Sequence, residues 1–402
     1  MHYGGLLGVI GLPWALTACT VGASPAESRA RVAAGNGDIV VAAPWPWEAR
    51  GGELRYAEGL DLAVAEINES GGIDGRRIRL IRPDDRQSVN EGRLIAQRLA
   101  EDPQVMAVIG HLQSYVTVPA AAIYDFAGLP LVSPSSTSAE LTSRNYARVF
   151  RATLTDQAIA RQMADYATGQ GYRQAVIYYV RNEYGRALAN AFEEQYQQGN
   201  LEVLARHSYD ANREPSPRSL EPVLDAWESL EPDAIFLAGE VPLAGRIIAA
   251  IRAAGIDVPV LGPDAMSTPG LVDEGGGAVE GTVVASFFHP DEPREEVSRF
   301  VERFQAAYDI VPDVTSALAY DALWVLAQAM RAARTPAPAN VSEALRRTDW
   351  HGVTGSFRFD QRGELLDRRI IRLVVRGGEF TYLQDEHPDI DGERVVARDR
   401  TP

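Results

Sequence analysis

Four hydroxyl side chains stand within five residues at the end of an apolar segment. The stretch 133–137 reads SPSST and directly follows the apolar run LPLV. Hydroxyl groups donate hydrogen bonds, and donors at the start of a helix can hold an anion because the helix N-terminus carries partial positive charge. Thr137 and Glu140 also have the T-x-x-E spacing of a capping box, in which Thr137 would start the next helix. Taken alone, the stretch is either a helix cap, which the T-x-x-E spacing favours, or the edge of a cleft that binds an anion.

Sequence motifs that mark the common enzyme classes are missing. No G-x-G-x-x-G follows the first expected strand, and no G-x-S-x-G occurs. All 39 basic residues are Arg, which rules out a Lys Schiff base and the phosphate-gripping Lys of a P-loop. The six His residues include no pair spaced by four, and a single Cys completes no zinc site. We therefore expect no enzyme, no metal and no cofactor.

We expect the titratable residues in two of the segments that follow apolar runs, 82–86 and 110–114, to have structural roles. His111 stands alone, and a lone His is more often a satisfied structural residue than a catalyst. Asp84 and Asp85 suggest a metal pair, but adjacent carboxylates after a strand more often cap the next helix or pair with Arg.

Charge and length limit the class of protein. The 402 residues include 55 acidic and 39 basic side chains, for a net charge of -16. A chain this acidic repels phosphate backbones, so we expect no nucleic-acid partner. The length suggests two domains or one large one, with enough apolar material for a sizeable core.

The N-terminal segment resembles a secretion signal. Residues 3–18 are uncharged and too short to span a bilayer comfortably, but they suit the apolar region of a signal peptide. The four residues 16–19, LTAC, resemble a bacterial lipobox, which predicts lipidation of Cys19 and a membrane anchor. The first residues lack Lys and Arg, unlike most signal peptides, so a wrongly assigned start codon or a disordered terminus stays open. The small, polar stretch 20–38 is typical of a flexible tether.

From residue 39 onward, short apolar runs alternate with helical patterns. This alternation predicts two α/β units with parallel sheets and a change of unit near 150–155. A later series of helices indicates that the chain returns to the first unit, and 355–360 with 368–375 predicts a hairpin. The expected organisation is a signal peptide and lipobox at 1–19, a tether at 20–38, the first part of lobe 1 at 39–153, lobe 2 at 154–283, a return to lobe 1 at 284–358, a hinge and completion of lobe 2 at 359–383, and a loose tail at 384–402.

Ligands of open parallel sheets bind beyond the carboxyl ends of the strands. We therefore expect the functional residues in the segments that follow the apolar runs. These segments are 43–47, 82–86, 110–114, 133–137, 180–185, 238–242 and 262–267.

Three stretches, 63–85, 110–142 and 251–264, resemble the branched-chain amino-acid-binding proteins, and the likeness runs in order from Ile39 to Val375. The resemblance implies a bilobal periplasmic-binding-protein fold of type I, with two Rossmann-like parallel-sheet lobes joined by a hinge. It also implies a monomeric receptor in the periplasm, or on the outer face of the cytoplasmic membrane. Such a receptor closes on a free amino acid and delivers it to the permease subunits of an ABC importer.

The resemblance also assigns roles to individual residues. Ser114, the backbone at Ser135 and the side chain of Thr137 would hold the ligand's α-carboxylate. Asp264 would bind the α-ammonium, and Tyr184 would pack over the ligand. The local alternatives are a turn role for Asp264 and hinge or core packing for Tyr184.

Two departures from the family pattern concern the ligand's side chain. Position 52, often Tyr in the family, is Gly, and Trp45 or Trp47 could cover the side-chain pocket instead or only pack the lobe edge. Glu240 replaces a position that is commonly aromatic. A second buried acid is costly without a partner, so Glu240 predicts either an exposed rim or a ligand with an extra donor or positive charge. The side chain of the ligand therefore stays open at this point.

Other functions remain compatible with the same pattern. A sensory receptor of this fold would bind a ligand but pass information to a partner instead of cargo to a permease. A receptor for amides, urea or small aromatic acids would not need a partner for an ammonium group.

Overall fold

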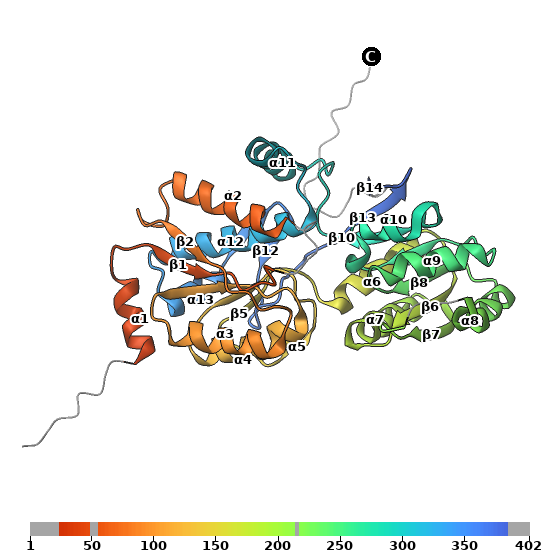
Figure 1. Ribbon diagram of the computed structural model, residues 1–402, viewed down its shortest axis with the longest axis horizontal. Helices are drawn as coiled ribbons and strands as arrows, with labels where there is room; N and C mark the ends of the chain where they lie inside the picture. Colours follow the sequence, from red (N-terminus) through yellow and green to blue (C-terminus); the bar gives the residue numbers. More distant parts are fainter. Residues whose placement is uncertain (1–23, 49–54, 214–216, 385–402) are drawn as a thin grey trace, which may run out of the picture.

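Two α/β lobes lie end to end along the long axis of the molecule (Figure 1). The computed structural model describes residues 24–48, 55–213 and 217–384. The expected lipidation site Cys19, its lipobox, Gly52 and residues 385–402 lie outside these ranges. In the described part of the chain, no helix combines the length and apolar character needed to cross a membrane.

Lobe 1 contains a five-stranded parallel sheet in the order β2-β1-β3-β4-β5. Its central strands are buried along their whole length, as expected when helices cover both faces of a parallel sheet. The strands are β1 (Ile39–Ala42), β2 (Ile78–Ile81), β3 (Val105–Ile109), β4 (Leu131–Ser133) and β5 (Val149–Arg151). The helices between them are α2 (Tyr56–Glu69), α3 (Val89–Glu101), α4 (Ser114–Phe126) and α5 (Glu140–Ser143).

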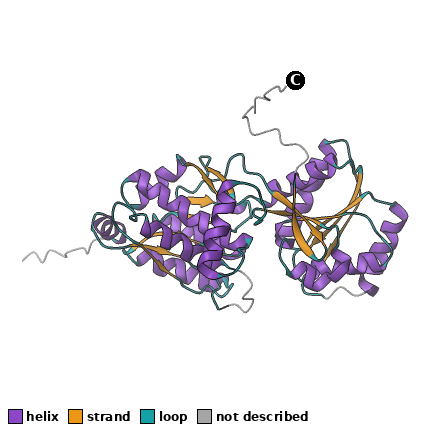
Figure 2. Ribbon diagram, turned by 90° about the horizontal axis from the view of Figure 1, so that it is seen from above, coloured by secondary structure: helices purple, strands orange, loops and turns teal. Residues whose placement is uncertain are grey.

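Lobe 2 contains a seven-stranded sheet in the order β14-β13-β10-β9-β8-β6-β7. Helices lie on both sides of this sheet, in the right-hand lobe of Figure 2. The strands are β6 (Gln174–Val180), β7 (Glu202–Tyr209), β8 (Ala234–Ala238), β9 (Val260–Gly262), β10 (Val283–Ser286), β13 (Ile371–Arg376) and β14 (Glu379–Leu383). The helices are α6 (Asp156–Gly169), α7 (Glu183–Gln198), α8 (Pro217–Leu230), α9 (Leu243–Ala253), η1 (Asp264–Met266), α10 (Gly270–Gly275) and η2 (Gly276–Val279).

The chain returns to lobe 1 after β10. Its returning elements are α11 (Glu295–Tyr308), α12 (Val314–Ala333), α13 (Pro338–Arg346), β11 (Asp349–Gly352) and β12 (Gly355–Arg358). Helix α12 packs directly along α2, where a Cβ on Gly59 would come within 2.1 Å of the Ser316 carbonyl oxygen. Only glycine permits this backbone approach. The chain thus crosses between the lobes three times, at 152–155, 287–294 and 359–370.

The predicted hairpin between 355–360 and 368–375 is wrong. Strand β12 pairs with β11, and β13 pairs with β14 across Gly377 and Gly378. These two glycines have φ values of +60° and +81°, the left-handed conformation that a tight two-residue hairpin turn requires. The segment 359–370 instead makes a tight local turn, closed by an antiparallel bridge between Phe359 and Leu365, and then connects the two lobes.

The expected tether is also wrong within its described residues. Helix α1 (Pro25–Ala33) begins at a capping box in which the Ser24 hydroxyl accepts from the Glu27 amide and Glu27 accepts from the Ser24 amide. Arg29 is 2% exposed, and its guanidinium donates to five main-chain carbonyls of lobe 1. Its acceptors are Leu99, Ala100, Asp102, Val105 and Ala127. The helix is therefore part of lobe 1.

Candidate ligand-binding site

Segments that follow the parallel strands of the two lobes meet through a chain of contacts. The Ser138 hydroxyl of lobe 1 donates to the Glu183 carboxylate of lobe 2 over 3.1 Å. On either side of this bond lie the polar residues that we call the interlobe site. They are Ser114, Ser135, Ser136, Thr137, Asp156, Asn182, Tyr184, Glu240 and Asp264.

On lobe 1, the hydroxyl groups gather at the start of α4. The Ser114 oxygen accepts from the Ser136 hydroxyl (3.1 Å) and from the Ser138 amide (3.3 Å). The Ser135 hydroxyl donates to the carbonyls of His111 (3.0 Å) and Leu112 (2.9 Å), which fixes the loop after β4 against the loop after β3. Gln113, the N-cap residue of α4, makes no side-chain cap bond, so the positive end of this 13-residue helix stays available to an anion.

Thr137 does not cap the next helix, which corrects the capping-box prediction. Helix α5 begins at Glu140, and the Glu140 amide donates to the Ser138 hydroxyl over 3.3 Å. Thr137 is 8% exposed, and its carbonyl accepts from the amide of Asp156 over 3.0 Å. The N-cap residue of α5 is Ala139, which makes no side-chain cap bond, whereas the Thr137 side chain hydrogen-bonds to Asp156 and therefore belongs to the interlobe site.

On lobe 2, Tyr184 and Asp264 form a pair. The Tyr184 hydroxyl donates to Oδ1 of Asp264 over 3.1 Å. Tyr184 occupies the first turn of α7, which Asn182 caps by accepting from the amide of Gly185 (2.9 Å). A Cβ on Gly185 would lie 2.1 Å from the Val180 carbonyl oxygen, so glycine is required for this tight passage from β6 into α7.

Burial governs the electrostatics of this pair. Removal from water raises the pKa of Asp264 to about 6, although the Tyr184 hydroxyl partly opposes the shift. Burial also raises the pKa of Tyr184 well above its usual value, and the neighbouring Asp264 adds to the effect. The tyrosine is therefore a hydrogen-bond donor throughout the physiological range, and no Arg or His of the described residues forms an ion pair with the carboxylate.

Glu240 follows β8 and lies beside the same pair. Its carboxylate accepts from the Asn182 side-chain amide over 3.2 Å. The side chain is partly buried, so the exposed-rim interpretation does not describe it fully.

Asp156 was missed by the sequence reasoning. It is the first residue of α6, is 3% exposed, and its Oδ1 has no hydrogen-bond partner among the described residues. Burial raises its pKa to about 7, a hydrogen bond from the Thr137 side chain lowers it, and the charge of Asp264 raises it further. The signal was available in the run RATLTD at 151–156, another segment that follows a strand, but the list of strand ends omitted it.

Trp47 stays a prediction as a ligand-binding residue. Its indole nitrogen donates to the Ala43 carbonyl over 3.0 Å, and the Arg82 guanidinium lies 5.2 Å from its ring centre. Trp45 is 5% exposed and stacks on Tyr56 with ring centres 3.6 Å apart, so Trp45 packs lobe 1.

His111 is buried in a structural network. Its Nδ1 lies 2.7 Å from Oδ2 of Asp85, and its Nε2 lies 3.1 Å from the Tyr124 hydroxyl. Asp85 therefore pairs with a histidine and not with an Arg. It does not cap α3 either, because Ser88 is the capping residue of that helix. Across the described ranges, no three His, Cys, Asp or Glu residues gather closely enough to hold a metal ion.

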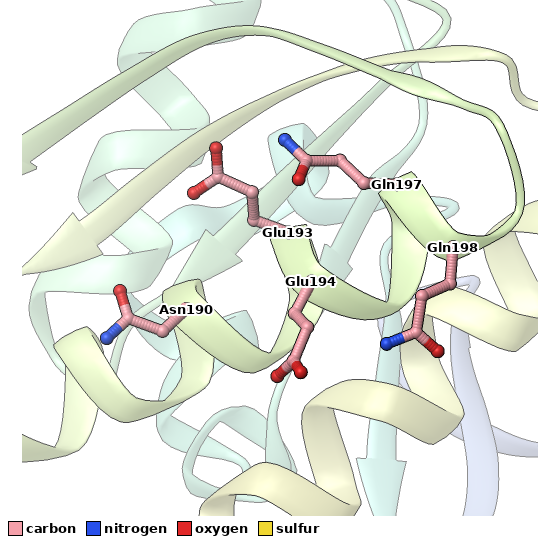
Figure 3. A pocket seen from close by; sticks show the side chains of 5 residues that line it. All are labelled: Asn190, Glu193, Glu194, Gln197 and Gln198. Atoms are coloured by element: carbon pink, nitrogen blue, oxygen red, sulfur yellow. The ribbon is translucent and has the colours of Figure 1, made fainter.

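A hollow of about 460 Å³ lies elsewhere, on the outer face of α7. Figure 3 shows that one helix supplies its polar lining residues, Asn190, Glu193, Glu194, Gln197 and Gln198. A second hollow lies beside the edge strand β2. Neither hollow contains a residue of the interlobe site, and a lining from a single exposed helix cannot enclose a small ligand.

Comparison with known proteins agrees with this arrangement. The family described as periplasmic binding protein matches residues 51–376. The leucine-specific-binding protein of Salmonella typhimurium is 26% identical over 352 residues, covering 87% of this chain and 90% of the relative. An ABC transporter substrate-binding protein from Desulfitobacterium hafniense, solved in complex with Leu, is 36% identical with a TM-score of 0.79, covering 86% of this chain and 100% of that one.

A further solved structure is the branched-chain amino acid transporter substrate binding protein of Streptococcus pneumoniae in complex with isoleucine. It is 25% identical with a TM-score of 0.74, covering 85% of this chain and 97% of that one. These likenesses confirm the expected family and the bilobal parallel-sheet fold. The chain belongs to the periplasmic binding protein family, and it is an extracytoplasmic solute-binding receptor of ABC transport, not an enzyme.

Proposed function

We propose that the protein captures a free amino acid between its two lobes and delivers it to the permease subunits of an ABC importer. The observation that carries this proposal is the Tyr184–Asp264 pair, a partly buried carboxylate that has a hydroxyl partner but no cationic partner in the part of the chain that the structure describes. A carboxylate in this state attracts an ammonium group, which makes charge-assisted hydrogen bonds stronger than neutral ones. The relatives named for leucine and the neighbour solved with Leu support an amino acid, branched-chain, aliphatic or related, as the cargo.

The opposite end of the amino acid would lie on lobe 1. Its α-carboxylate would accept from the hydroxyls of Ser114 and Thr137 and from the backbone at Ser135. The N-terminus of α4 adds partial positive charge there, so no Arg is needed. The ligand would thus join an anion-binding lobe to a cation-binding lobe, and its binding energy would favour closure about the three crossing segments.

We also propose that the receptor acts as a monomer anchored to the membrane by a lipid on Cys19. The uncharged stretch 3–18 and the lipobox-like residues 16–19 support the anchor. Trp47 remains a proposed contact for the ligand's side chain.

A thermal-shift and calorimetric screen of the full chain against all amino acids tests the proposed function. A ligand at a hundredfold its Kd should stabilise the fold by about 2.7 kcal/mol. Asp264→Asn keeps the size of the side chain but removes its charge, and we expect affinity to fall about 10- to 100-fold. Asp257→Asn is the matched control, because this carboxylate of the same lobe is 93% exposed.

Two results would contradict the proposal. One is the absence of binding by any amino acid, and the other is unchanged affinity in Asp264→Asn. Binding of urea, an amide or a small aromatic acid that survives Asp264→Asn would assign the receptor to those ligands instead.

A further inference from the structure

One buried guanidinium holds the loop that supplies the hydroxyl groups of lobe 1. Arg151 is the last residue of β5, and its side chain is fully buried. Its Nη1 donates to the carbonyl of Ser136, and its Nη2 donates to the carbonyl of Ser138 over 2.7 Å. Nη2 also donates to the Thr142 hydroxyl of α5 over 3.2 Å. A single charged side chain therefore fixes the course of the chain between β4 and α5.

The bond to Ser136 also sets the direction of the next amide group. The peptide unit is planar and trans, so the carbonyl of Ser136 and the N–H of Thr137 point in opposite directions. Because Arg151 binds this carbonyl inside lobe 1, the N–H of Thr137 points away from the guanidinium. Thr137 is buried, and its amide has no hydrogen-bond acceptor among the described residues. A buried amide without an acceptor is rare and costly, so this donor is available to a ligand.

The arrangement separates hydrogen-bond donors from acceptors along the loop. The carbonyl oxygens of Ser136 and Ser138 would repel a carboxylate, but the guanidinium binds both of them. The hydroxyl of Ser114, the hydroxyl of Thr137 and the amide of Thr137 lie in the same loop region as donors. A loop whose negative ends are bound in the lobe interior and whose donors remain is suited to an anion.

Glu364 fixes the guanidinium from a segment that crosses between the lobes. Its two carboxylate oxygens accept from Nε and from Nη2 of Arg151, each over 3.0 Å, and this two-point contact fixes the plane of the guanidinium. The Arg151 amide donates to the carbonyl of Gly363 over 2.8 Å. The far end of the segment is bound to lobe 2, where Gln162 of α6 accepts from the Ile370 amide over 3.0 Å. One side chain thus connects the hydroxyl-rich loop to a segment that joins the two lobes.

We propose that Arg151 is a positioning residue for the ligand's α-carboxylate, and that Glu364 sets the orientation of its guanidinium. This inference rests on the amino-acid function proposed above and deepens it. Arg151 does not touch the ligand, because its side chain is fully buried and all three of its side-chain nitrogens donate to protein acceptors. Its role is to direct the Thr137 amide toward the carboxylate and to bind the two carbonyls that would oppose it.

Doubly labelled leucine tests the proposal at the two ends of the ligand. Leucine with ¹³C at its carboxyl carbon and ¹⁵N at its amino group is bound to the full chain at saturation, and NMR records one bound resonance for each end. In Glu364→Gln and Arg151→Lys, we expect the calorimetric Kd for leucine to rise about tenfold or more. At saturation, the bound carboxyl resonance should move toward its position in free leucine, whereas the bound ammonium resonance should stay in place. A variant that only loosens the fold would raise the Kd without separating the two ends.

Glu193→Gln is the matched control for Glu364→Gln. The side chains of Glu193 and Glu364 are 29% and 24% exposed, and each accepts from an Arg, over 2.8 Å and 3.0 Å. Glu193 lies on the outer face of α7, away from the interlobe site, so its replacement should leave the Kd and both resonances unchanged. Glu364→Gln keeps the size of the side chain and one acceptor oxygen, so it tests the proposal even where Arg151→Lys fails to fold.

The outcomes separate this inference from the proposed function. An unchanged carboxyl resonance, or equal movement of both resonances, would overturn the positioning role and leave the amino-acid function standing. Failure of every amino acid to bind the unchanged protein would overturn the proposed function, on which this inference rests. Where another amino acid binds more tightly than leucine, its labelled form replaces leucine, because the α-carboxylate is common to all of them.

Discussion

At the residue scale, the main feature of the interlobe site is a set of carboxylates that are buried from water and form no ion pair with any described Arg or His. Asp264 and Asp156 have pKa values raised to about 6 and about 7, chiefly because burial disfavours their charged forms. Both groups therefore take up protons close to neutral pH. The groups around them are Tyr184, Thr137, Arg151, Glu183 and Glu240.

Ligand affinity should consequently depend on pH. An ammonium group binds the ionised carboxylates, so its binding favours deprotonation, and protonation of Asp264 and Asp156 competes with it. We expect affinity for the best amino-acid ligand to fall at least tenfold between pH 8 and pH 5, measured by calorimetric titration. In Asp264→Asn the pH dependence should be smaller, and a flat profile in the unchanged protein would contradict the assignment of these carboxylates.

The ligand-free protein should respond to acid in the opposite direction. Because the folded-state pKa values lie above the ordinary value of 3.8, the folded chain binds more protons than the unfolded chain between about pH 4 and pH 7. Protonation of these two groups therefore raises the free energy of unfolding as the pH falls through 7 and 6. Their ionisation lowers the free energy of unfolding as the pH rises. Urea unfolding at pH 8 and pH 6, compared between the unchanged protein and the Asp156→Asn variant, measures this contribution.

At the element scale, local patterns were enough to predict the alternating strands and helices. Buried runs such as 105–109 and 234–238 form the strands β3 and β8, and Ser114, Tyr184 and Asp264 stand just after strands because parallel sheets place functional residues there. The predictions that failed concern which of two neighbouring residues makes a given hydrogen bond. The spacing of Thr137 and Glu140 fits a capping box, yet the adjacent Ser138 reaches the Glu140 amide instead.

Pairing between distant elements could not be predicted from the sequence. The segments 355–358 and 371–376 are both strand-like, but they do not pair with each other. The first pairs with β11 and the second with β14, and the connection between them spans the two lobes. Glu240 was predicted from a family position, whereas Asp156 becomes prominent only once the fold brings its carboxylate near Asp264 and Thr137. Sequence patterns indicate the ends of strands, but the balance of charge at a site depends on tertiary packing.

Helix α1 gives an element-scale prediction. Arg29→Met would leave the carbonyls at 99, 100, 102, 105 and 127 without their charged donor inside lobe 1. We expect a loss of about 2–4 kcal/mol in the free energy of unfolding, measured by urea denaturation followed by circular dichroism. Ligand affinity should not change, since α1 does not contact the interlobe site.

Arg31→Met is the matched control on the same helix. Arg31 is exposed and donates only a long 3.4 Å bond to the Ser28 hydroxyl, so its replacement should cost less than about 0.5 kcal/mol. Equal losses in the two variants would show that α1 is not held through Arg29.

At the scale of the whole molecule, the lobes have largely separate cores. Helix α12 belongs mainly to the core of lobe 1, although its Leu318 packs in the core of lobe 2. Besides the crossing segments, the Ser138–Glu183 hydrogen bond joins the loops on the two sides of the interlobe site. A bond of this kind is worth about 0.5–1.5 kcal/mol, and exposure of Glu183 reduces it further, so it cannot by itself hold the lobes closed.

The ligand should therefore determine how far the lobes close. Shifting the ratio of closed to open molecules from 1:99 to 99:1 requires about 5.5 kcal/mol of differential binding, which contacts of the two charged ends of an amino acid with the two lobes can supply together. Small-angle X-ray scattering should show a smaller radius of gyration at saturating ligand than without it. In Asp264→Asn at the same ligand concentration, most of this compaction should disappear, because one lobe loses its charged hold on the ammonium. An unchanged radius of gyration in a protein that calorimetry shows to be saturated would mean that cargo is held by one lobe alone, and the interlobe mechanism would be wrong.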